Sequence, residues 1–418
     1  MRARSEEIMG PLFQSVGAAR TYRRATNGAP RRSVACVRIV HISDCYPPRL
    51  GGIETQVRAL ALRQVAAGHD VHVITATPGA TVRRGTEVLD GVVVHRATTQ
   101  LPADLPVNPR VNREIRELLQ PGGRAQGADA VHVHGGVLSV FAYPGARVAR
   151  VLGLPTVATI HGVWGGIFAP AVRVADVLSH WTRWGVVLTA VSDAAADPIR
   201  RLVGSEVEIA VLPNGIDVDT WRAAHVTGDP DEVRLVAVMR MAPRKRTVPL
   251  VRMAHEASRL LPAGRRLRLS IVGEGPVASQ VRRYVARHGL GHGRFVVDLV
   301  GRLAPDQVRA TLAASDAFIA PAKLESFGIA ALEARTVGVP VLAYAAGGVS
   351  SFVRHEVEGL LASDDPSMIG AIARIGSDDD LRRRIATHNR ETEPEQSWPR
   401  VLAAVDAAYA VARVRSAP

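Results

Sequence analysis

Apolar and polar positions alternate along the chain in a way that predicts two open parallel sheets. Short apolar runs alternate with stretches of helical apolar spacing, and this succession of strand, helix and strand is typical of a parallel sheet covered on both faces. The first series of predicted strands covers Val37–Ile42, Val71–Thr75, Val92–His95, Ala130–His134, Thr156–Ile160 and Val186–Val191.

The strand and helix pattern restarts after Asp217. The segment Val226–Glu232 is polar, contains glycine and proline, and has the composition of a linker. The last stretch, Ser397–Val414, has the apolar spacing of a helix. The second series of predicted strands covers Arg234–Met239, Arg268–Val272, Val296–Val300, Ala317–Ala320, Val339–Ala343 and a strand near Leu360.

The sequence therefore predicts an α/β fold of two facing Rossmann-like, doubly wound domains with a cleft between them. The predicted parts are an N-terminal arm (residues 1–33), a first domain (34–222), a second domain (223–395) and a C-terminal helix (396–418). Ligands of open parallel sheets bind at the carboxyl ends of the strands, so the functional residues are expected in the loops that follow strands.

Composition narrows the class of protein. A chain of 418 residues is too long for one ordinary core, and its 47% apolar and 22% charged residues are normal for a globular protein. No apolar run approaches the roughly 20 residues that span a bilayer. The N-terminus lacks a signal-peptide pattern, and Cys36 and Cys45 form neither a disulfide framework nor a zinc site. A cytoplasmic location is expected.

The net charge of +13 favours an anionic partner. The arm, residues 1–33, holds seven arginines and two glutamates and is expected to be mostly disordered, with a short amphipathic piece at Leu12–Tyr22. No aromatic residues are interleaved with the charges, so no nucleic-acid partner is expected. An anionic membrane surface, such as the inner face of the plasma membrane, stays open as a peripheral binding site, and the oligomeric state is unknown.

Only two of the 52 basic residues are lysines, Lys245 and Lys323. Lysine offers a compact point charge where arginine offers a planar fork, so both positions are candidates for a function. Chance survival in an arginine-rich chain explains Lys323 equally well.

One loop combines Glu325-Ser326-Phe327-Gly328 with Glu333 further along the chain. A helix is expected to begin near Ser326, where exposed amides attract phosphate, and Gly328 lets a ligand approach the backbone. Glu325 is placed to hold sugar hydroxyls and Glu333 to reach a ribose. The alternative is a helix with an acidic first turn and no ligand.

Arg240 and Lys245 follow a strand and are five residues apart. Two cations there would neutralise a diphosphate leaving group. The alternative is a pair of solvated basic residues, and Arg244 and Arg246 obscure which charge matters.

Glycines and a histidine follow strands of the first domain. Gly51 and Gly52 lie between the first strand and its helix, where backbone amides can face phosphate, although a tight turn needs the same glycines. The dinucleotide fingerprint G-x-G-x-x-G is absent. His161 ends an apolar strand and is a candidate to bind a sugar hydroxyl, with a structural role as the alternative.

No metal site is expected. His132 and His134 share a strand face, but no third ligand is evident from the sequence. The run Asp378-Asp379-Asp380 has the context of an acidic helix start.

Taken together, these motifs resemble those of glycosyltransferase family 4, a retaining family with the GT-B fold. Glu325 and Glu333 resemble its E-x7-E motif, and the resemblance covers nearly all of residues 37–410. The other matching segments are Gly51-Gly52-Ile53-Glu54, Thr159-Ile160-His161-Gly162, Val191-Ser192, Pro213-Asn214-Gly215-Ile216-Asp217, Arg240 with Lys245, Val272-Gly273-Glu274-Gly275-Pro276, Gly338-Val339-Pro340-Val341 and Trp398, which opens a helix that in the family crosses back onto the first domain.

The resemblance implies a retaining, metal-independent transfer of a hexosyl group from a GDP- or UDP-linked sugar to a hydroxyl acceptor, with no other cofactor. It implies catalytic roles for His161, Arg240, Lys245 and Glu325. The implied donor-binding residues are Gly51, Gly52, Gly273, Ser326, Phe327, Gly328 and Glu333. The acceptor, lipid-linked or a small-molecule glycan, would bind the first domain near Gly52 and His161.

The sequence departs from the family at two places. Met239 stands where the family has glycine, and Ser350 and Ser351 stand where many members have proline and an acidic residue. Two alternatives therefore stay open: a catalytically weak protein of the same fold that binds a nucleotide sugar or a membrane, and a GT-B sugar phosphorylase or epimerase.

Overall fold

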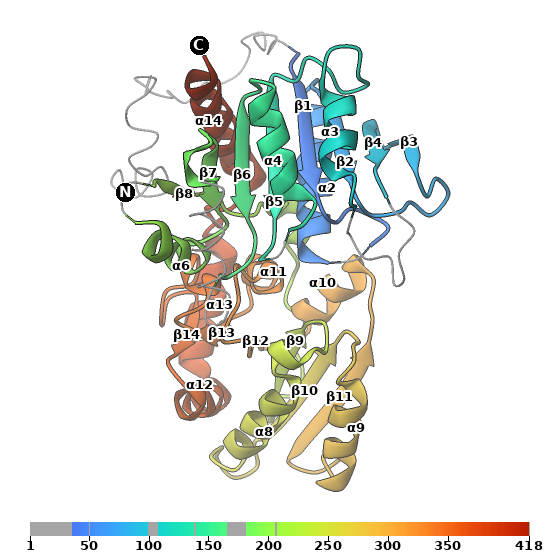
Figure 1. Cartoon of the computed structure of the whole chain (residues 1–418). Helices are drawn as coiled ribbons and strands as arrows, with labels where there is room; N and C mark the ends of the chain where they lie inside the picture. Colours follow the sequence, from blue (N-terminus) through green and yellow to red (C-terminus); the bar gives the residue numbers. More distant parts are fainter. Residues whose placement is uncertain are drawn as a thin grey trace. The chain divides into compact units, whose positions relative to one another are not determined.

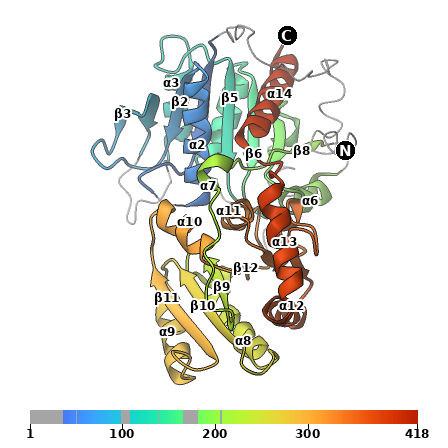
Figure 2. The same cartoon turned by 180° about the vertical axis from the view of Figure 1, so that it is seen from behind.

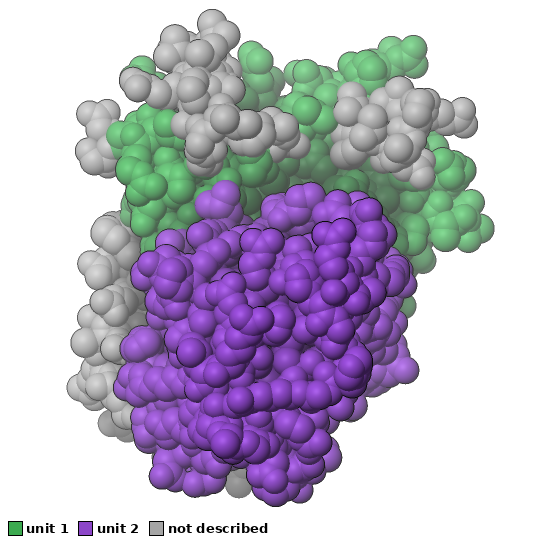
Figure 3. Space-filling model, turned by 90° about the horizontal axis from the view of Figure 1, so that it is seen from below, with its two compact units in different colours: residues 1–213, 401–418 green, residues 214–400 purple. Residues whose placement is uncertain are grey.

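The computed structural model describes residues 36–49, 51–98, 108–137, 139–164, 181–204 and 207–417. They form two compact units, coloured separately in Figure 3: unit 1 is made of residues 1–213 and 401–418, and unit 2 of residues 214–400. The predicted arm and its amphipathic piece lie outside the described residues.

Unit 1 is built on an eight-stranded sheet in the order β3-β4-β2-β1-β5-β6-β7-β8 (Figure 1). Every neighbouring pair of strands is parallel except β3 with β4. The strands are β1 (Arg38–Ser43), β2 (Asp70–Thr75), β3 (Gly85–Leu89), β4 (Val92–Arg96), β5 (Ala130–Gly135), β6 (Thr156–Ile160), β7 (Val187–Ala190) and β8 (Ile209–Val211).

Helices cover both faces of this sheet. Figures 1 and 2 show α3 (Val111–Leu119) and α4 (Ala142–Val151) on one face, and α2 (Gly52–Ala66) and α14 (Trp398–Ser416) on the other. The alternation of side chains along β1 explains this arrangement, because Ile42 lies against Gly145 of α4 while His41 bonds to Gln64 of α2. Helix α6 (Asp193–Val203) follows β7, and the short 3-10 helix η3 spans Trp181–Arg183.

Unit 2 is built on a six-stranded sheet in the order β11-β10-β9-β12-β13-β14, and all its strands are parallel. Its core joins buried residues of β9 and β10 to apolar residues of two helices, such as Leu250 of α8 (Thr247–Ser258) and Ile372 of α12 (Asp365–Ser377). The strands are β9 (Glu232–Val238), β10 (Arg266–Val272), β11 (Phe295–Gly301), β12 (Ala317–Ala320), β13 (Val341–Tyr344) and β14 (Gly359–Ala362). The helices are α7 (Val218–Trp221), α8 (Thr247–Ser258), α9 (Ala278–Arg287), α10 (Pro305–Ala313), α11 (Ile329–Val337), α12 (Asp365–Ser377) and α13 (Asp379–Glu391), with 3-10 helices η4 (Pro243–Lys245) and η5 (Gly348–Ser351).

All the predicted strands occur, each within a few residues of its predicted limits. The pattern missed β3 and β8. Strand β3 is an antiparallel edge strand whose residues are partly exposed, and β8 has only three residues, so neither has the apolar run of a buried parallel strand.

The boundary between the units lies at Pro213–Asn214, where the sequence pattern had placed it at residues 222–223. The segment after Pro213 stays with unit 2 because Ile216 forms a β-bridge with Ser397 and Gly215 lies directly against the indole of Trp398. The second boundary lies at Arg400–Val401 for the same reason. Helix α14 therefore begins in unit 2 and continues in unit 1.

None of the helices in the described part of the chain combines the length and the apolar composition that crossing a membrane requires. Both cysteines, Cys36 and Cys45, are free thiols.

The buried contact of Trp398 with Gly215 predicts a large loss of stability for Trp398→Ala. Removing a buried tryptophan side chain costs about 3–5 kcal/mol, and we expect a loss of this size in the free energy of unfolding of unit 2, measured by urea titration with circular dichroism. Trp221→Ala is the control, because Trp221 is more exposed. Equal effects of the two substitutions would contradict this role of Trp398.

Candidate functional site

The predicted site residues of unit 2 lie in loops that follow parallel strands. Arg240 and Lys245 follow β9, Gly273 follows β10, and the Glu325–Gly328 segment follows β12. Because the strands are parallel, their carboxyl ends meet at one edge of the sheet, where ligands of such sheets bind. The fold therefore brings segments far apart in sequence to one edge of unit 2.

Lys245 and Glu325 form an ion pair at this edge. The Lys245 Nζ lies 2.5 Å from the Glu325 Oε2, although the two residues are 80 positions apart. The side chains are only 21% and 15% exposed, so solvent screens the pair less than a pair on an open surface. Both residues are predicted site residues, but their positions in the sequence do not show that they touch.

The neighbouring basic residues have different contacts, which separates their roles from that of Lys245. Arg246 donates hydrogen bonds to the Tyr344 hydroxyl and to the Asp365 carboxylate. The bond from Arg246 to Asp365 holds the pKa of the Asp365 carboxyl well below its ordinary value. The Lys323 ammonium lies 3.0 Å from Asp365 and over the Tyr344 ring. Lys323 and Arg246 thus share one carboxylate, whereas Arg244 is exposed.

Arg240 is exposed, and no ion pair or hydrogen bond of its side chain occurs within the described ranges. Its loop is fixed by pairing with the loop after β10, since the Met239 amide donates to Val272 and the Met241 amide to Glu274. Gly273 has a positive φ of 124°, and a Cβ there would overlap the Met239 carbonyl oxygen. Gly273 thus lets the loop after β10 lie directly against the backbone of Met239, next to Arg240.

The Glu325–Gly328 segment is held by the loop after β13. The Gly348 amide donates to the Glu325 carbonyl at 2.7 Å, and a Cβ at Gly348 would overlap the Ser326 carbonyl. Phe327 is buried against Phe352, so only its backbone is available to a ligand. The pair Gly347-Gly348 therefore allows the loop after β13 to lie directly against the backbone of Glu325 and Ser326.

Ser350 and Ser351 close a turn of η5. Their hydroxyls donate to the carbonyls of Gly347 and Gly348. The serines that replace the usual proline and acidic residue therefore have a structural use in this chain.

Helix α11 begins at Ile329, three residues later than the start predicted near Ser326. Gly328 is the N-cap and adopts the left-handed conformation with a φ of 92°, which delays the first helical residue. No side chain caps the helix, and its first turn holds no acidic residue. The alternative of an acidic first turn is thus wrong, and this helix start has the positive partial charge that attracts an anion.

Glu333 lies in the second turn of α11 and is partly buried. Burial raises the pKa of its carboxyl to about 8. No hydrogen bond or ion pair of this side chain occurs among the described residues, so a carboxyl group is held in a poorly solvated place without a protein partner.

In unit 1, Gly51 and Gly52 begin α2, which follows β1. Gly51 is the N-cap and Gly52 the first helical residue, and both are exposed. Glu54 is buried beside Gly51 and pairs with Arg49 at 3.3 Å. The glycines therefore leave the helix start open, but an acidic group already lies there.

His161 follows β6 and is almost completely buried. Its Nε2 lies 3.2 Å from the Nδ1 of His134, and burial lowers its pKa to about 4. The side chain is thus neutral at pH 7, and one of its two ring nitrogens has a protein partner.

His132 and His134 do have a third histidine beside them, which the sequence analysis missed. Ring nitrogens of His41, His132 and His134 lie within 4.8 Å of one another. His41 belongs to β1 and is in register with His132 of β5. The parallel pairing of the two predicted strands was the signal that could have shown this cluster.

The aspartates at 378–380 form a helix start, as the sequence analysis predicted. Asp378 is the N-cap of α13 and accepts a hydrogen bond from the Leu381 amide. Asp379 and Asp380 pair with Arg382 and Arg383 in the first turn.

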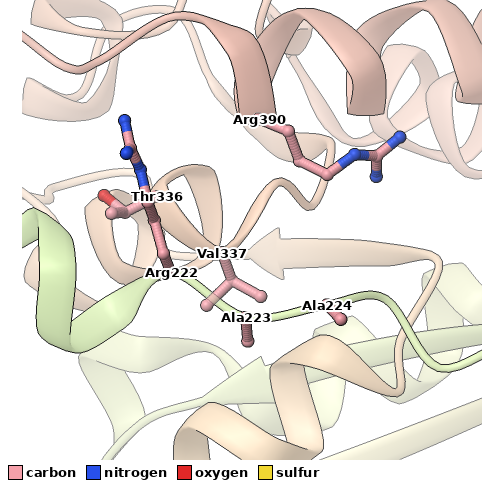
Figure 4. A pocket seen from close by; sticks show the side chains of 6 residues that line it. All are labelled: Arg222, Ala223, Ala224, Thr336, Val337 and Arg390. Atoms are coloured by element: carbon pink, nitrogen blue, oxygen red, sulfur yellow. The ribbon is translucent and has the colours of Figure 1, made fainter.

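An open pocket of about 300 Å³ lies elsewhere in unit 2, and none of the predicted site residues lines it (Figure 4). It is formed by the segment after α7, the end of α11 and one residue of α13. Its lining consists of Arg222, Ala223, Ala224, Thr336, Val337 and Arg390.

Comparisons with known proteins place both units in one enzyme class. The model of Glycosyltransferase Family 4 matches residues 50–220, and the model of Glycosyl transferases group 1 matches residues 219–392. The glycogen synthase of Mycobacterium tuberculosis (strain ATCC 25618 / H37Rv) is 28% identical over 409 residues, which cover 90% of this chain and 95% of the relative.

Solved structures agree with the fold. The structure of Alr3699/HepE from Anabaena, in complex with UDP and glucose, has a TM-score of 0.61 at 18% identity and covers 91% of this chain and 98% of its own. The catalytic domain of starch synthase IV from Arabidopsis thaliana, bound to ADP and acarbose, has a TM-score of 0.65 at 15% identity, covering 91% and 100%. With family models matching in tandem across both Rossmann-like units, the chain belongs to the group 1 glycosyltransferases of the family 4 type, with the GT-B fold.

Proposed function

We propose that this glycosyltransferase moves a hexosyl group from a nucleoside-diphosphate sugar to a hydroxyl acceptor, with retention of anomeric configuration and without a metal. The observation that carries the proposal is the ion pair of Lys245 with Glu325 beside the uncapped start of α11. It combines a cation for a diphosphate with a carboxylate for sugar hydroxyls at the binding edge of a parallel sheet.

The diphosphate would bind Lys245, Arg240 and the amides at the start of α11. Arg240 is exposed and without a partner among the described side chains, and the helix start has no N-cap side chain and carries a positive partial charge. The leaving diphosphate gains charge as the glycosidic bond breaks, so these groups stabilise the transition state more than the bound donor.

The sugar and the ribose would bind the two glutamates. Glu325 would accept hydrogen bonds from sugar hydroxyls beside the Lys245 ammonium. Glu333 would meet the ribose, whose hydroxyls can supply the hydrogen bonds that its partly buried carboxyl lacks in the protein. Alr3699/HepE was solved with UDP and starch synthase IV with ADP, which supports a nucleoside diphosphate and leaves the base open.

The acceptor would bind unit 1 near Gly52 and His161, both of which follow strands of that sheet. Front-face attack fits the charges: the bond from the anomeric carbon to the phosphate oxygen breaks, the acceptor oxygen bonds to the same face, and its proton passes to the leaving phosphate. Because Lys245 already engages Glu325, a covalent role for this carboxylate is disfavoured. A glycosyl adduct on Glu325 or an inverted product would contradict this mechanism.

We further propose a cytoplasmic location with peripheral attachment to an anionic membrane surface. The net charge of +13 supports this proposal.

Nucleotide binding tests the donor site. Among UDP, GDP and ADP, one is expected to stabilise the protein by about 2.7 kcal/mol when present at one hundred times its dissociation constant, measured by thermal unfolding. Lys245→Ala should lose this stabilisation. Arg266→Ala should keep it, since Arg266 lies at the opposite, amino end of β10, where it pairs with Asp229. No stabilisation by any nucleotide at millimolar concentration would contradict the proposed donor.

The pH dependence of stability tests the state of Glu333. The folded protein releases this proton near pH 8 and the unfolded chain near 4.5, so stability falls as the pH rises between these values. Glu333→Gln removes this loss. Its free energy of unfolding should equal that of the unmodified protein at about pH 4 and exceed it at about pH 9 by a few kcal/mol, at roughly 1.4 kcal/mol per pKa unit.

Urea titration across the pH range measures this difference. Glu274→Gln is the matched control, because Glu274 lies in the same unit and is exposed, so its substitution should leave the pH profile unchanged. Parallel profiles for Glu333→Gln and the unmodified protein would show that Glu333 is already solvated or paired.

A further inference from the structure

A continuous chain of hydrogen bonds connects His161 to the interior of unit 1. His161 Nε2 lies 3.2 Å from His134 Nδ1, His134 Nε2 lies 2.9 Å from His41 Nδ1, and His41 Nε2 lies 2.7 Å from the Gln64 Oε1. All four residues are buried. These hydrogen bonds thus connect His161, a predicted residue of the site for the acceptor substrate, to Gln64 of α2.

A second branch begins at the same glutamine. Gln64 Nε2 donates to the Tyr409 hydroxyl at 3.1 Å, and this hydroxyl lies 3.0 Å from His132 Nδ1. His132 Nε2 lies 2.7 Å from the Thr159 hydroxyl, which lies 2.7 Å from the Thr189 hydroxyl. The Thr189 hydroxyl donates to the carbonyl of Ala158 at 3.3 Å.

The end of this branch fixes the direction of the whole network. A carbonyl oxygen can only accept, so Thr189 is the donor to Ala158, and with its one proton used there it accepts from Thr159. The Gln64 amide agrees with this direction, because its nitrogen faces Tyr409 and its oxygen faces His41. Thr159 then accepts from His132 Nε2–H, and His132 Nδ1 accepts from Tyr409. Tyr409 in turn accepts from the Gln64 amide nitrogen, which points the Gln64 oxygen toward His41.

The same direction continues through the first branch. Burial lowers the pKa values of His41 and His161 to about 4 and that of His134 well below its ordinary value, so at pH 7 each ring has one donor and one acceptor nitrogen. His41 Nε2–H donates to the Gln64 oxygen, His134 Nε2–H to His41, and His161 Nε2–H to His134. The opposite orientation of Gln64 would reverse every bond and leave Thr189 unable to donate to Ala158.

We propose that Gln64, acting through His41 and His134, is a positioning residue that fixes His161 as the Nε2–H tautomer. His161 Nδ1 then keeps a lone pair, and it takes part in no hydrogen bond with the described residues. His161 Nδ1 can therefore accept a hydrogen bond from a substrate hydroxyl, and the side chain cannot donate one to a substrate. Its use for a substrate hydroxyl rests on the proposed function, whereas the tautomer does not.

A metal ion bound by His41, His132 and His134 is the competing interpretation of the same cluster. The hydrogen bonds disfavour it, because every ring nitrogen of these three residues already has a protein partner. To bind these histidines, a metal ion would need nitrogen lone pairs that already accept hydrogen bonds within the protein.

Nitrogen NMR of the ligand-free protein tests the tautomer. In protein labelled with ¹⁵N-histidine, protonated and unprotonated ring nitrogens have well-separated shifts, and His161→Asn assigns the His161 signals. We expect His161 to carry its proton on Nε2 at pH 7. In Gln64→Leu, His41 loses its acceptor, and His161 should shift toward the Nδ1–H tautomer.

Two further substitutions in α2 serve as controls for the NMR experiment. Gln64→Glu retains an acceptor for His41, so it should restore the Nε2–H tautomer. Gln56→Leu, at a residue of similar burial in α2, should leave the His161 signals unchanged. A proton on His161 Nδ1 in the unmodified protein, an unchanged tautomer in Gln64→Leu, or zinc that binds one to one and shifts the signals of all three clustered histidines would overturn the proposal.

Transfer kinetics form a separate arm. Gln64→Leu should lower kcat/KM for the acceptor about tenfold, the effect of one lost hydrogen bond, and leave nucleotide stabilisation unchanged. The expected tautomers in a protein that binds no nucleotide would contradict the proposed function alone. Nucleotide binding in a protein with the opposite tautomer would contradict the histidine chain alone.

Discussion

The ion pair between Lys245 and Glu325 is the contact on which the candidate donor site depends. It joins the loops after β9 and β12, which are neighbouring parallel strands, so the sheet places the cation and the carboxylate together. The glycine loop after β13 also holds Glu325, because the Gly348 amide donates to its carbonyl. A diphosphate bound as proposed would share or replace this pairing, so the pair would compete with the donor for Lys245 as well as form part of its site.

The fold could be predicted from the sequence wherever burial dictates the pattern. Strands of a parallel sheet are covered on both faces, so their apolar runs identified β1, β5 and β9 within a few residues. The pattern was silent on β3, whose edge position leaves it partly polar. It also placed the unit boundary too late, because the pairing of Ile216 with Ser397 is a contact between distant segments that no local pattern encodes.

The candidate site, too, could be predicted where one segment holds the information, but not where distant segments meet. Residue types and spacing within one segment singled out Glu325, Gly328 and Glu333, but spacing could not show that Lys245 reaches Glu325 or that Arg246 is engaged by Asp365. The position of the α11 start also escaped the sequence, because it depends on the left-handed conformation of Gly328. The missed histidine chain depends on strand register, which becomes visible only once the strand order is known.

The roles assigned to Lys245 and Glu325 can be tested by calorimetry on Glu325→Gln, which compares the binding of a nucleoside diphosphate with that of the corresponding nucleotide sugar. Glutamine frees Lys245 from its carboxylate and leaves one neutral acceptor oxygen for sugar hydroxyls in place of two charged ones. We expect the nucleoside diphosphate to bind the variant at least as tightly as it binds the unmodified protein, and the added affinity due to the sugar to fall. Loss of nucleoside diphosphate binding together with the sugar contribution, or an unchanged sugar contribution, would contradict the assigned roles of Lys245 and Glu325.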